Sequence, residues 1–223
     1  MTHAETAQPQ REQQVPDAFV RLGGWLFKRR TVLPLPIALI LLLVPSSRPE
    51  NPGAFWAGVA TVAAGELLRL WAVLHIGVIS RTRSDRLGPL VSTGPFAWVR
   101  NPLYIGNLLL WIGFALSARL LWWLPLVVVL FALEYHAIVR WEEGLLDSRL
   151  GDAYREYSAR VPRWLPGGRR SHVTIRKPET QTAMFSWRQT LYSERGTLIA
   201  IAVGYLVLWL KTSLPSIWWW SSW

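Results

Sequence analysis

The apolar residues of this chain gather in blocks, and this pattern limits its possible folds more than any other feature. The five blocks cover residues 31–45, 54–79, 102–117, 120–139 and 197–210. A helix needs about 20 apolar residues to cross a hydrocarbon core of about 30 Å. The second and fourth blocks meet that length, and the third does so if it tilts, whereas the first and fifth are short enough to be re-entrant or interfacial. We therefore predict an all-α integral membrane protein with about five transmembrane helices.

The basic residues lie almost entirely on one side of this arrangement. Five of the 24 Lys and Arg precede the first block, four lie between the second and third, and eleven lie between the fourth and fifth. If all five blocks cross, only Arg48, Arg119 and Lys211 fall on the other side, with Arg69 inside a block. The positive-inside rule then predicts a cytoplasmic N-terminus and an external C-terminus. The net charge of +10 indicates contact with anionic membrane lipids rather than with nucleic acid.

Several kinds of site are missing from the sequence. The chain has no cysteine, so disulfides, thiolate metal sites and a thiol nucleophile are excluded. Its four histidines have no paired metal-ligand spacing, and we expect no bound metal ion. Neither of the common Gly-rich phosphate loops is present, so a nucleotide-containing cofactor would be held in another way.

A first polar segment stands at the start of the third apolar block. Gly94 opens a turn that leads to Arg100, and Pro102 suits the first turn of a helix, with Asn101 as its N-cap. These features could form an ordinary capped helix. Together with Tyr104 and Asn107 on the following turns, however, they would make a receptor for a carboxylate or a similar anion.

A second polar segment follows the fourth block. Glu142 and Glu143 come directly after a predicted span, where carboxylates are costly and usually have a partner or a ligand. Beyond them an apolar face recurs at helical spacing and predicts one amphipathic helix on the cytoplasmic membrane face. This face consists of Leu146, Leu150, Tyr154, Tyr157 and Val161.

Three charged residues lie inside predicted spans. Glu66 and Arg69 are three residues apart and share a helix face, and Glu134 stands in the fourth span. They could form a structural salt bridge, or they could line a polar channel for a substrate.

These segments resemble the isoprenylcysteine carboxyl methyltransferase and phospholipid methyltransferase family of integral membrane enzymes. The first segment is similar to the family's Gly-Pro-aromatic turn followed by Arg-His-Pro-x-Tyr, and the second to its Glu-Glu pair with a closing Val-Pro-Arg-x-x-Pro. Two positions depart from the pattern, because Asn101 stands for the usual histidine and Leu150 for an aromatic residue. Asn101 cannot take up a proton near neutral pH, which makes a general-base role there doubtful.

The resemblance implies S-adenosylmethionine-dependent methyl transfer to a lipophilic or amphipathic acceptor at the cytoplasmic membrane face. It implies catalytic roles for Arg100 and Glu142. The substrate channel would be the one that Glu66, Arg69 and Glu134 could line. The implied cofactor-binding residues are Gly94, Asn101, Tyr104, Asn107, Glu143, Tyr154 and Arg163. The domain organisation expected on this basis is a disordered tail over residues 1–24, a membrane methyltransferase core over 25–166, and a connector with a C-terminal transmembrane helix over 167–223.

Two other functions stay open at this point. Membrane reductases of the steroid-reductase type use NADPH and have a similar Pro-x-Tyr-x-Gly segment, but here Asn107 stands where that group has Glu. A non-catalytic lipid-binding membrane protein is the second alternative. The basic, cysteine-free composition and the charge pattern are typical of a protein of the bacterial inner membrane.

Overall fold

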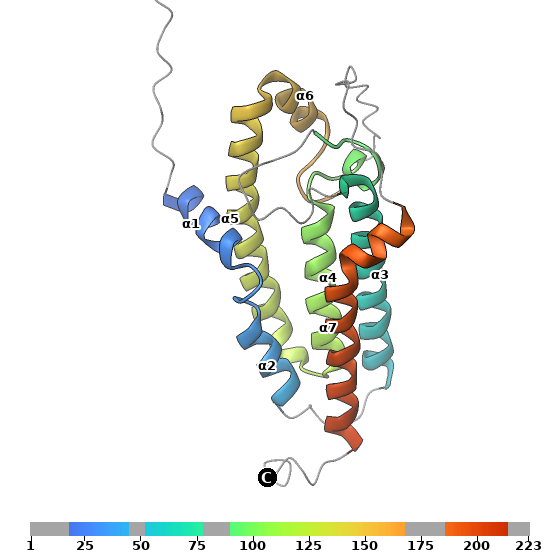
Figure 1. The fold of residues 1–223 in the computed structure, drawn as a ribbon. Coiled ribbons are helices and arrows are strands. Elements are labelled where there is room, and N and C mark those ends of the chain that lie inside the picture. Colours follow the sequence, from blue (N-terminus) through green and yellow to red (C-terminus); the bar gives the residue numbers. More distant parts are fainter. Residues whose placement is uncertain (1–17, 45–51, 78–89, 168–185, 214–223) are drawn as a thin grey trace, which may run out of the picture.

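The fold was obtained as a computed structural model, which describes residues 18–44, 52–77, 90–167 and 186–213 (Figure 1). All regular elements in these ranges are helices. The α-helices are α1 (Ala18–Arg29), α2 (Leu35–Leu43), α3 (Pro52–Ile76), α4 (Pro102–Ser117), α5 (Leu124–Leu150), α6 (Asp152–Arg160) and α7 (Trp187–Ser213). Two short 3-10 helices, η2 (Gly94–Ala97) and η3 (Leu121–Trp123), precede α4 and α5.

Among the described residues, three helices are long and apolar enough to cross a membrane. They cover Pro52–Ile76, Leu121–Leu150 and Trp187–Ser213. The second and fourth predicted blocks are thereby confirmed as membrane-length helices, and the fifth, predicted to be short, belongs to a helix of 27 residues. The protein is therefore an integral membrane protein.

The other two predicted spans are shorter than a bilayer. Helix α4 has 16 residues, or about 24 Å at 1.5 Å per residue, and packs along the full-length α3. Helix α2 has only nine residues, about 14 Å. Figure 1 shows α1 and α2 following one another along the side of α5.

Helix α1 changes one predicted boundary. The disordered tail was expected to reach residue 24, but residues 18–24 are helical, and the rest of that segment lies outside the described residues. Phe27 of α1 is buried in a cluster with Val127, Phe131, Tyr135 and Ile138 of α5. This burial of an aromatic side chain explains why the helix starts earlier than the polar composition suggests.

Helices α3 and α4 approach each other at glycines. A Cβ added at Gly65 would lie 2.8 Å from the carbonyl oxygen of Gly106, and one added at Gly113 would lie 2.8 Å from that of Gly58. Small residues allow such close backbone contact between membrane helices. The contact fixes the register of α3 against α4, and with it the relative positions of the polar side chains on both helices.

The predicted single amphipathic helix is divided in two. Gly151 has φ +52° and separates α5 from α6, because a glycine tolerates this left-handed conformation without a side-chain clash. The apolar face predicted across this break is nevertheless present: Tyr154, Tyr157 and Val161 are buried together and pack against Leu146 and Leu150. Much of this face is therefore buried inside the protein.

Candidate functional site

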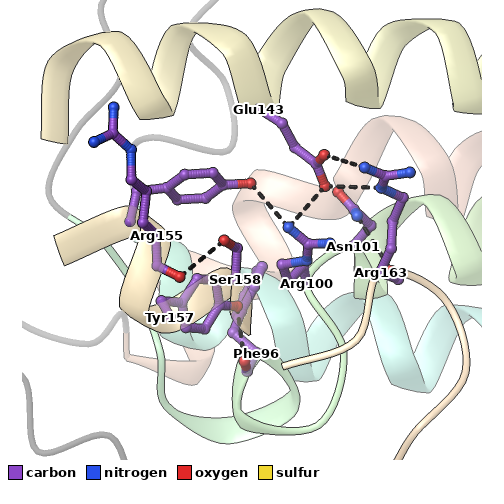
Figure 2. A network of polar contacts seen from close by, with 9 residues as sticks. Phe96, Arg100, Asn101, Glu143, Arg155, Tyr157, Ser158 and Arg163 are labelled. Atoms are coloured by element: carbon purple, nitrogen blue, oxygen red, sulfur yellow. Dashed lines mark hydrogen bonds and ion pairs between the residues drawn. The ribbon is translucent and has the colours of Figure 1, made fainter. Parts of the chain in front are cut away.

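The polar side chains of the two sequence segments meet at the end of the molecule where α5 turns into α6 (Figures 1 and 2). Glu143 is at the centre of this outer cluster, which we define as Arg100, Glu143, Tyr154 and Arg163. Arg163 donates two hydrogen bonds to the Glu143 carboxylate, at 3.0 and 2.5 Å, and Arg100 Nη1 lies 3.2 Å from the same group. Arg100 also donates to the Tyr154 hydroxyl at 3.3 Å. One carboxylate thus holds two guanidinium groups.

Backbone contacts lock the two segments together around this cluster. The Arg100 amide donates to the Pro162 carbonyl at 2.9 Å, and the buried Tyr157 hydroxyl donates to the Phe96 carbonyl at 2.8 Å. Asn101 was predicted to cap α4 with its side chain. It does occupy the N-cap position, but its side chain makes no capping bond and donates to the Arg163 carbonyl at 3.2 Å instead. The residue therefore joins the two segments.

Burial affects the tyrosines that lie beside the outer cluster. It raises the pKa of the Tyr154 phenol to about 12, and the nearby Glu143 carboxylate acts in the same direction. The pKa of Tyr157 is raised further for the same main reason, its burial. Both phenols therefore keep their protons at neutral pH and serve as neutral hydrogen-bond groups. Hydrogen bonds to Glu143 likewise raise the pKa of Arg163.

A second contact links α4 to α5 next to the outer cluster. The Tyr104 hydroxyl donates to the Glu142 carboxylate at 3.0 Å. Two carboxylates, Glu142 and Glu143, therefore stand side by side at the end of α5, each with its own partner from the first sequence segment.

Deeper along α3 and α4 lies a separate inner cluster, which we define as Glu66, Arg69, Asn107, Glu194 and Thr197. The Arg69 guanidinium bonds to Asn107 and to Glu194, and it donates to the Thr197 hydroxyl at 3.2 Å. Its Nε lies 3.4 Å from a carboxylate oxygen of Glu66. Glu194 and Thr197 belong to α7, so the last helix completes this cluster.

A cavity of about 300 Å³ connects the two clusters. This volume is at the lower end of the roughly 300–1,000 Å³ that is usual for small-molecule sites. Its wall includes most of the predicted site residues, namely Arg69, Arg100, Asn101, Tyr104, Asn107, Glu142, Glu143 and Tyr154. Apolar side chains, among them Phe27, Val73 and Ile76, form much of the rest of the wall.

Four predicted site residues lie off this wall. Arg163 is held behind Glu143, and Glu66 behind Arg69. Gly94 supports the turn before Arg100: its φ is +60°, and an added Cβ would lie 2.5 Å from the His75 ring. Glu134 lies apart on α5, and one of its carboxylate oxygens is buried without a hydrogen-bond partner among the described residues.

Two charged residues of the cavity wall were not proposed as site residues from the sequence. Arg30 follows α1 and lies near Tyr104 and Glu142, but in the sequence it is one of several basic residues that precede an apolar block. Glu194 stands three residues before the fifth block, which as drawn from composition began at residue 197. Helix α7 begins ten residues earlier than that, at Trp187. The signal in the sequence that could have identified Glu194 was the position of an acidic residue so close to an apolar block. The described residues contain no group of three or more His, Asp or Glu arranged to hold a metal ion.

Comparison with known proteins relates part of this chain to a known family. Residues 54–153 match the family described as Phospholipid methyltransferase. The chain is 31% identical over 150 residues to the cobalt-zinc-cadmium resistance protein CzcN of Cupriavidus metallidurans, covering 66% of this chain and 63% of that protein. It is 29% identical over 153 residues to the nickel-cobalt-cadmium resistance protein NccN of Alcaligenes xylosoxydans, covering 66% and 64%.

Human protein-S-isoprenylcysteine O-methyltransferase is 32% identical over 130 residues, which cover 53% of this chain and 44% of the human protein. The chain thus spans less than two thirds of the length of these relatives. No solved structure has significant similarity to it. The matched residues contain all of α4 and α5 and nearly all of α3, and so include Arg69, Arg100, Glu142 and Glu143. Residues 54–153 are therefore similar to the phospholipid methyltransferase family, and the relatives of the chain include isoprenylcysteine O-methyltransferases.

Proposed function

We propose that this protein transfers a methyl group from S-adenosylmethionine to a lipophilic or amphipathic acceptor at the cytoplasmic face of a membrane. The observation that carries the proposal is the cavity of about 300 Å³ whose wall joins both polar segments of the family domain. A pocket that combines apolar walls with a few convergent charged groups is the usual form of a small-molecule site.

The residues present suit the chemical groups of this cofactor. Its carboxylate would bind Arg100, whose Nε is buried without a hydrogen-bond partner in the part of the chain that the structure describes. Its ribose hydroxyls and ammonium group would bind Glu142 and Glu143, which offer carboxylate oxygens to the cavity. The outer cluster fixes Arg100 and Glu143 against each other, so little ordering is left for binding.

When bound, the cofactor supplies an activated methyl group on a sulfonium. The protein's own contribution is then mainly to align the two reactants and to exclude water, since proximity and orientation alone can account for about 7–11 kcal/mol of a barrier. Phe27, Val73 and Ile76 suit the exclusion of water, because they give the cavity an apolar wall next to its charged groups.

The acceptor would reach the cavity from the bilayer. We propose that it carries an apolar tail, because the cavity lies among helices of membrane length and its wall is partly apolar. The names of the bacterial relatives describe metal resistance, whereas those of the eukaryotic ones describe methylation of isoprenylcysteine. We favour methyl transfer because the groups in this cavity suit an organic ligand with an anionic end.

The location follows from the same pattern of charge. We propose a bacterial inner-membrane protein with a cytoplasmic N-terminus and an external C-terminus. The outer cluster would then lie at the cytoplasmic face, where the positively charged loops of the sequence are expected.

Binding of S-adenosylhomocysteine to the detergent-purified protein tests the proposal. A ligand that binds only the folded state stabilises it by about 2.7 kcal/mol at 100 times its dissociation constant, which a thermal unfolding curve detects. We expect this stabilisation with S-adenosylhomocysteine and not with NADPH. We expect it to be lost in Arg100→Ala and kept in Arg155→Ala, a matched control because Arg155 is exposed on α6.

Each other outcome has a defined meaning. Stabilisation by NADPH alone would replace the proposal with a membrane reductase. A folded protein that responds to neither ligand would favour a non-catalytic lipid-binding role. Equal loss of the response in both arginine variants would contradict the assignment of Arg100 to the cofactor site.

A further inference from the structure

An open groove of about 470 Å³ lies between α1 and α5, outside the cavity described above. Three of the residues that line it are cations, and none of the described residues in its wall is acidic. The outer and inner clusters each pair arginine with carboxylate, whereas the charge in this groove is positive only. We call it the basic groove and define it by Arg21, Trp25, Lys28 and Arg29 of α1 with Trp141 and Leu145 of α5.

The charges of the basic groove follow from the way α1 is attached to the protein. Gly23 and Phe27 are buried, and they fix one face of the helix. Arg21, Trp25 and Lys28 are spaced by four and three residues, so they share another face. Both cations of that face are exposed. Helix α1 therefore packs on the protein with one face and presents the positive charge of the other to its surroundings.

Aromatic side chains lie beside these charges. The Arg29 guanidinium lies 4.4 Å from the centre of the Trp25 ring, a cation–π contact that restricts the position of this cation. Trp141 approaches α1 at a glycine, because a Cβ added at Gly24 would lie 2.8 Å from its indole nitrogen. Indole rings are favoured at the membrane interface, where one part contacts acyl chains and the N–H contacts polar groups. The groove thus combines cations with interfacial aromatic residues.

The helix dipole accounts for only part of this charge. Lys28 and Arg29 stand in the last turn of α1, where the dipole attracts cations. Arg21 stands near the other end of the helix, where the dipole favours an anion, and the first turn of α1 contains no acidic residue. An anion bound in the groove would supply the negative charge that this arrangement favours.

We propose that the basic groove binds the phosphate group of one anionic membrane phospholipid. Guanidinium and ammonium groups donate charge-assisted hydrogen bonds to phosphate oxygens, and anionic lipids are drawn to basic segments beside membrane helices. Leu22 and Trp25 of the same helix are 45% and 46% exposed, and they offer an apolar surface to the acyl chains. A soluble phosphate ion would meet the same cations but would leave this apolar surface in water, so we favour the lipid.

This lipid would support the cavity without entering it. Trp141 and Leu145 line both the groove and the cavity, and Phe27 and Arg30 in or after α1 line the cavity alone. A phospholipid that contacts α1 and α5 together would hold these wall residues in place. The inference does not rest on methyl transfer, since it concerns the outer side of this wall.

Binding of lipids with the same chains tests the inference. Dioctanoyl phosphatidylglycerol and dioctanoylglycerol, which lacks the phosphate, would be titrated against the full chain in a non-ionic detergent at neutral pH. Native mass spectrometry counts the bound molecules and gives their affinities. We expect one phosphatidylglycerol to bind about tenfold more tightly than dioctanoylglycerol, a ratio that corresponds to about 1.4 kcal/mol. Inorganic phosphate at the same concentration should not displace it.

Variants locate the bound lipid. Arg21→Gln combined with Lys28→Gln should abolish the tenfold preference, and each single variant should reduce it, which keeps the test usable if the double variant does not fold. The matched control combines Arg155→Gln with Arg160→Gln. It removes the same two charges from α6, where both side chains are 51% exposed, and should keep the preference.

Three results would overturn the inference. Equal affinity for the two lipids would mean that the groove recognises only acyl chains, and displacement by inorganic phosphate would make the ligand a soluble anion. An equal loss in the α6 control would mean that the net charge of +10 attracts lipids without a defined site.

The same samples keep this inference separate from the proposed function. If S-adenosylhomocysteine binds but the lipid preference is missing, the basic groove is not a lipid site and the methyltransferase proposal stands. If the preference is present but S-adenosylhomocysteine does not bind, the lipid site belongs to a protein with another activity.

Discussion

The outer and inner clusters are built from the same kinds of side chain in opposite proportions. At the outer end, Arg100 and Arg163 share the single carboxylate of Glu143. At the inner end, Glu66 and Glu194 share the single guanidinium of Arg69. Cations thus outnumber carboxylates in the outer cluster, and carboxylates outnumber cations in the inner one.

This contrast suits a ligand site that takes different chemical groups at the two clusters. Cations suit the carboxylate of the proposed cofactor, whereas carboxylates suit groups that donate hydrogen bonds. The contrast between them can be tested by substitutions that act on one end only.

The largest effect is expected at the inner end. Arg69→Ala leaves two carboxylates buried without a cation, and the removal of one partner from a buried ion pair typically lowers the free energy of unfolding by roughly 3–5 kcal/mol. Thermal unfolding in detergent measures the loss. Adding Glu66→Gln and Glu194→Gln to the same protein should restore much of it, and a failure to do so would mean that the loss comes from packing.

The next effect is expected at the outer end. Glu143→Gln keeps the shape of the side chain but removes the charge that holds Arg100 and Arg163. We expect the affinity for S-adenosylhomocysteine to fall about tenfold or more, because charge-assisted hydrogen bonds are worth about 1.5–3 kcal/mol. An unchanged affinity would contradict the assignment of Glu143 to the cofactor site.

A smaller effect is expected in the turn that leads to the outer cluster. Gly94→Ala forces an alanine into the left-handed region, at about 1–2 kcal/mol, and brings its Cβ within 2.5 Å of the His75 ring. Gly151→Ala is the matched control, since its φ is +52° but no atom lies within 4 Å of an added Cβ. Thermal unfolding should show a larger decrease for Gly94→Ala. Equal decreases would mean that the His75 ring gives way without cost.

The smallest effect is expected on the surface of α6. Arg155 forms ion pairs with Asp147 and Asp152, but its side chain is 51% exposed. Exposed ion pairs contribute little because water and salt screen them. Arg155→Ala should therefore leave thermal stability and the binding of S-adenosylhomocysteine unchanged within error. A measurable loss of binding would show that α6 contributes to the site through its charged face.

The membrane-length helices could be predicted because apolar length is a local property of the sequence. The helices of the third and first blocks were harder to predict. Helix α4 is short and packs along α3, and α2 is a short helix that follows α1. The break at Gly151 was not predicted, because the apolar residues keep their helical spacing across it. This spacing carries no information on a change in the direction of the helix axis.

The contacts of the site were only partly accessible from the sequence. Arg100 and Glu143 could be chosen through the resemblance to a family, but their pairing across 43 positions has no local signal. The side chain of Asn101 bonds to a carbonyl 62 residues away, which a capping rule cannot foresee. Glu194 was missed for a similar reason, because its partner Arg69 is 125 residues distant.

The glycine contacts between α3 and α4 also bear on how the cavity can open. Backbones that touch at Gly65 and Gly106 leave no side chains between them to rearrange, so these two helices should move as one body. Arg69 and Asn107 are carried on that body, whereas Glu142 and Glu194 are carried on α5 and α7. For a molecule to enter sideways from the lipid, α5 or α7 would have to move away from the α3–α4 pair. The pair itself would keep its internal arrangement during this opening.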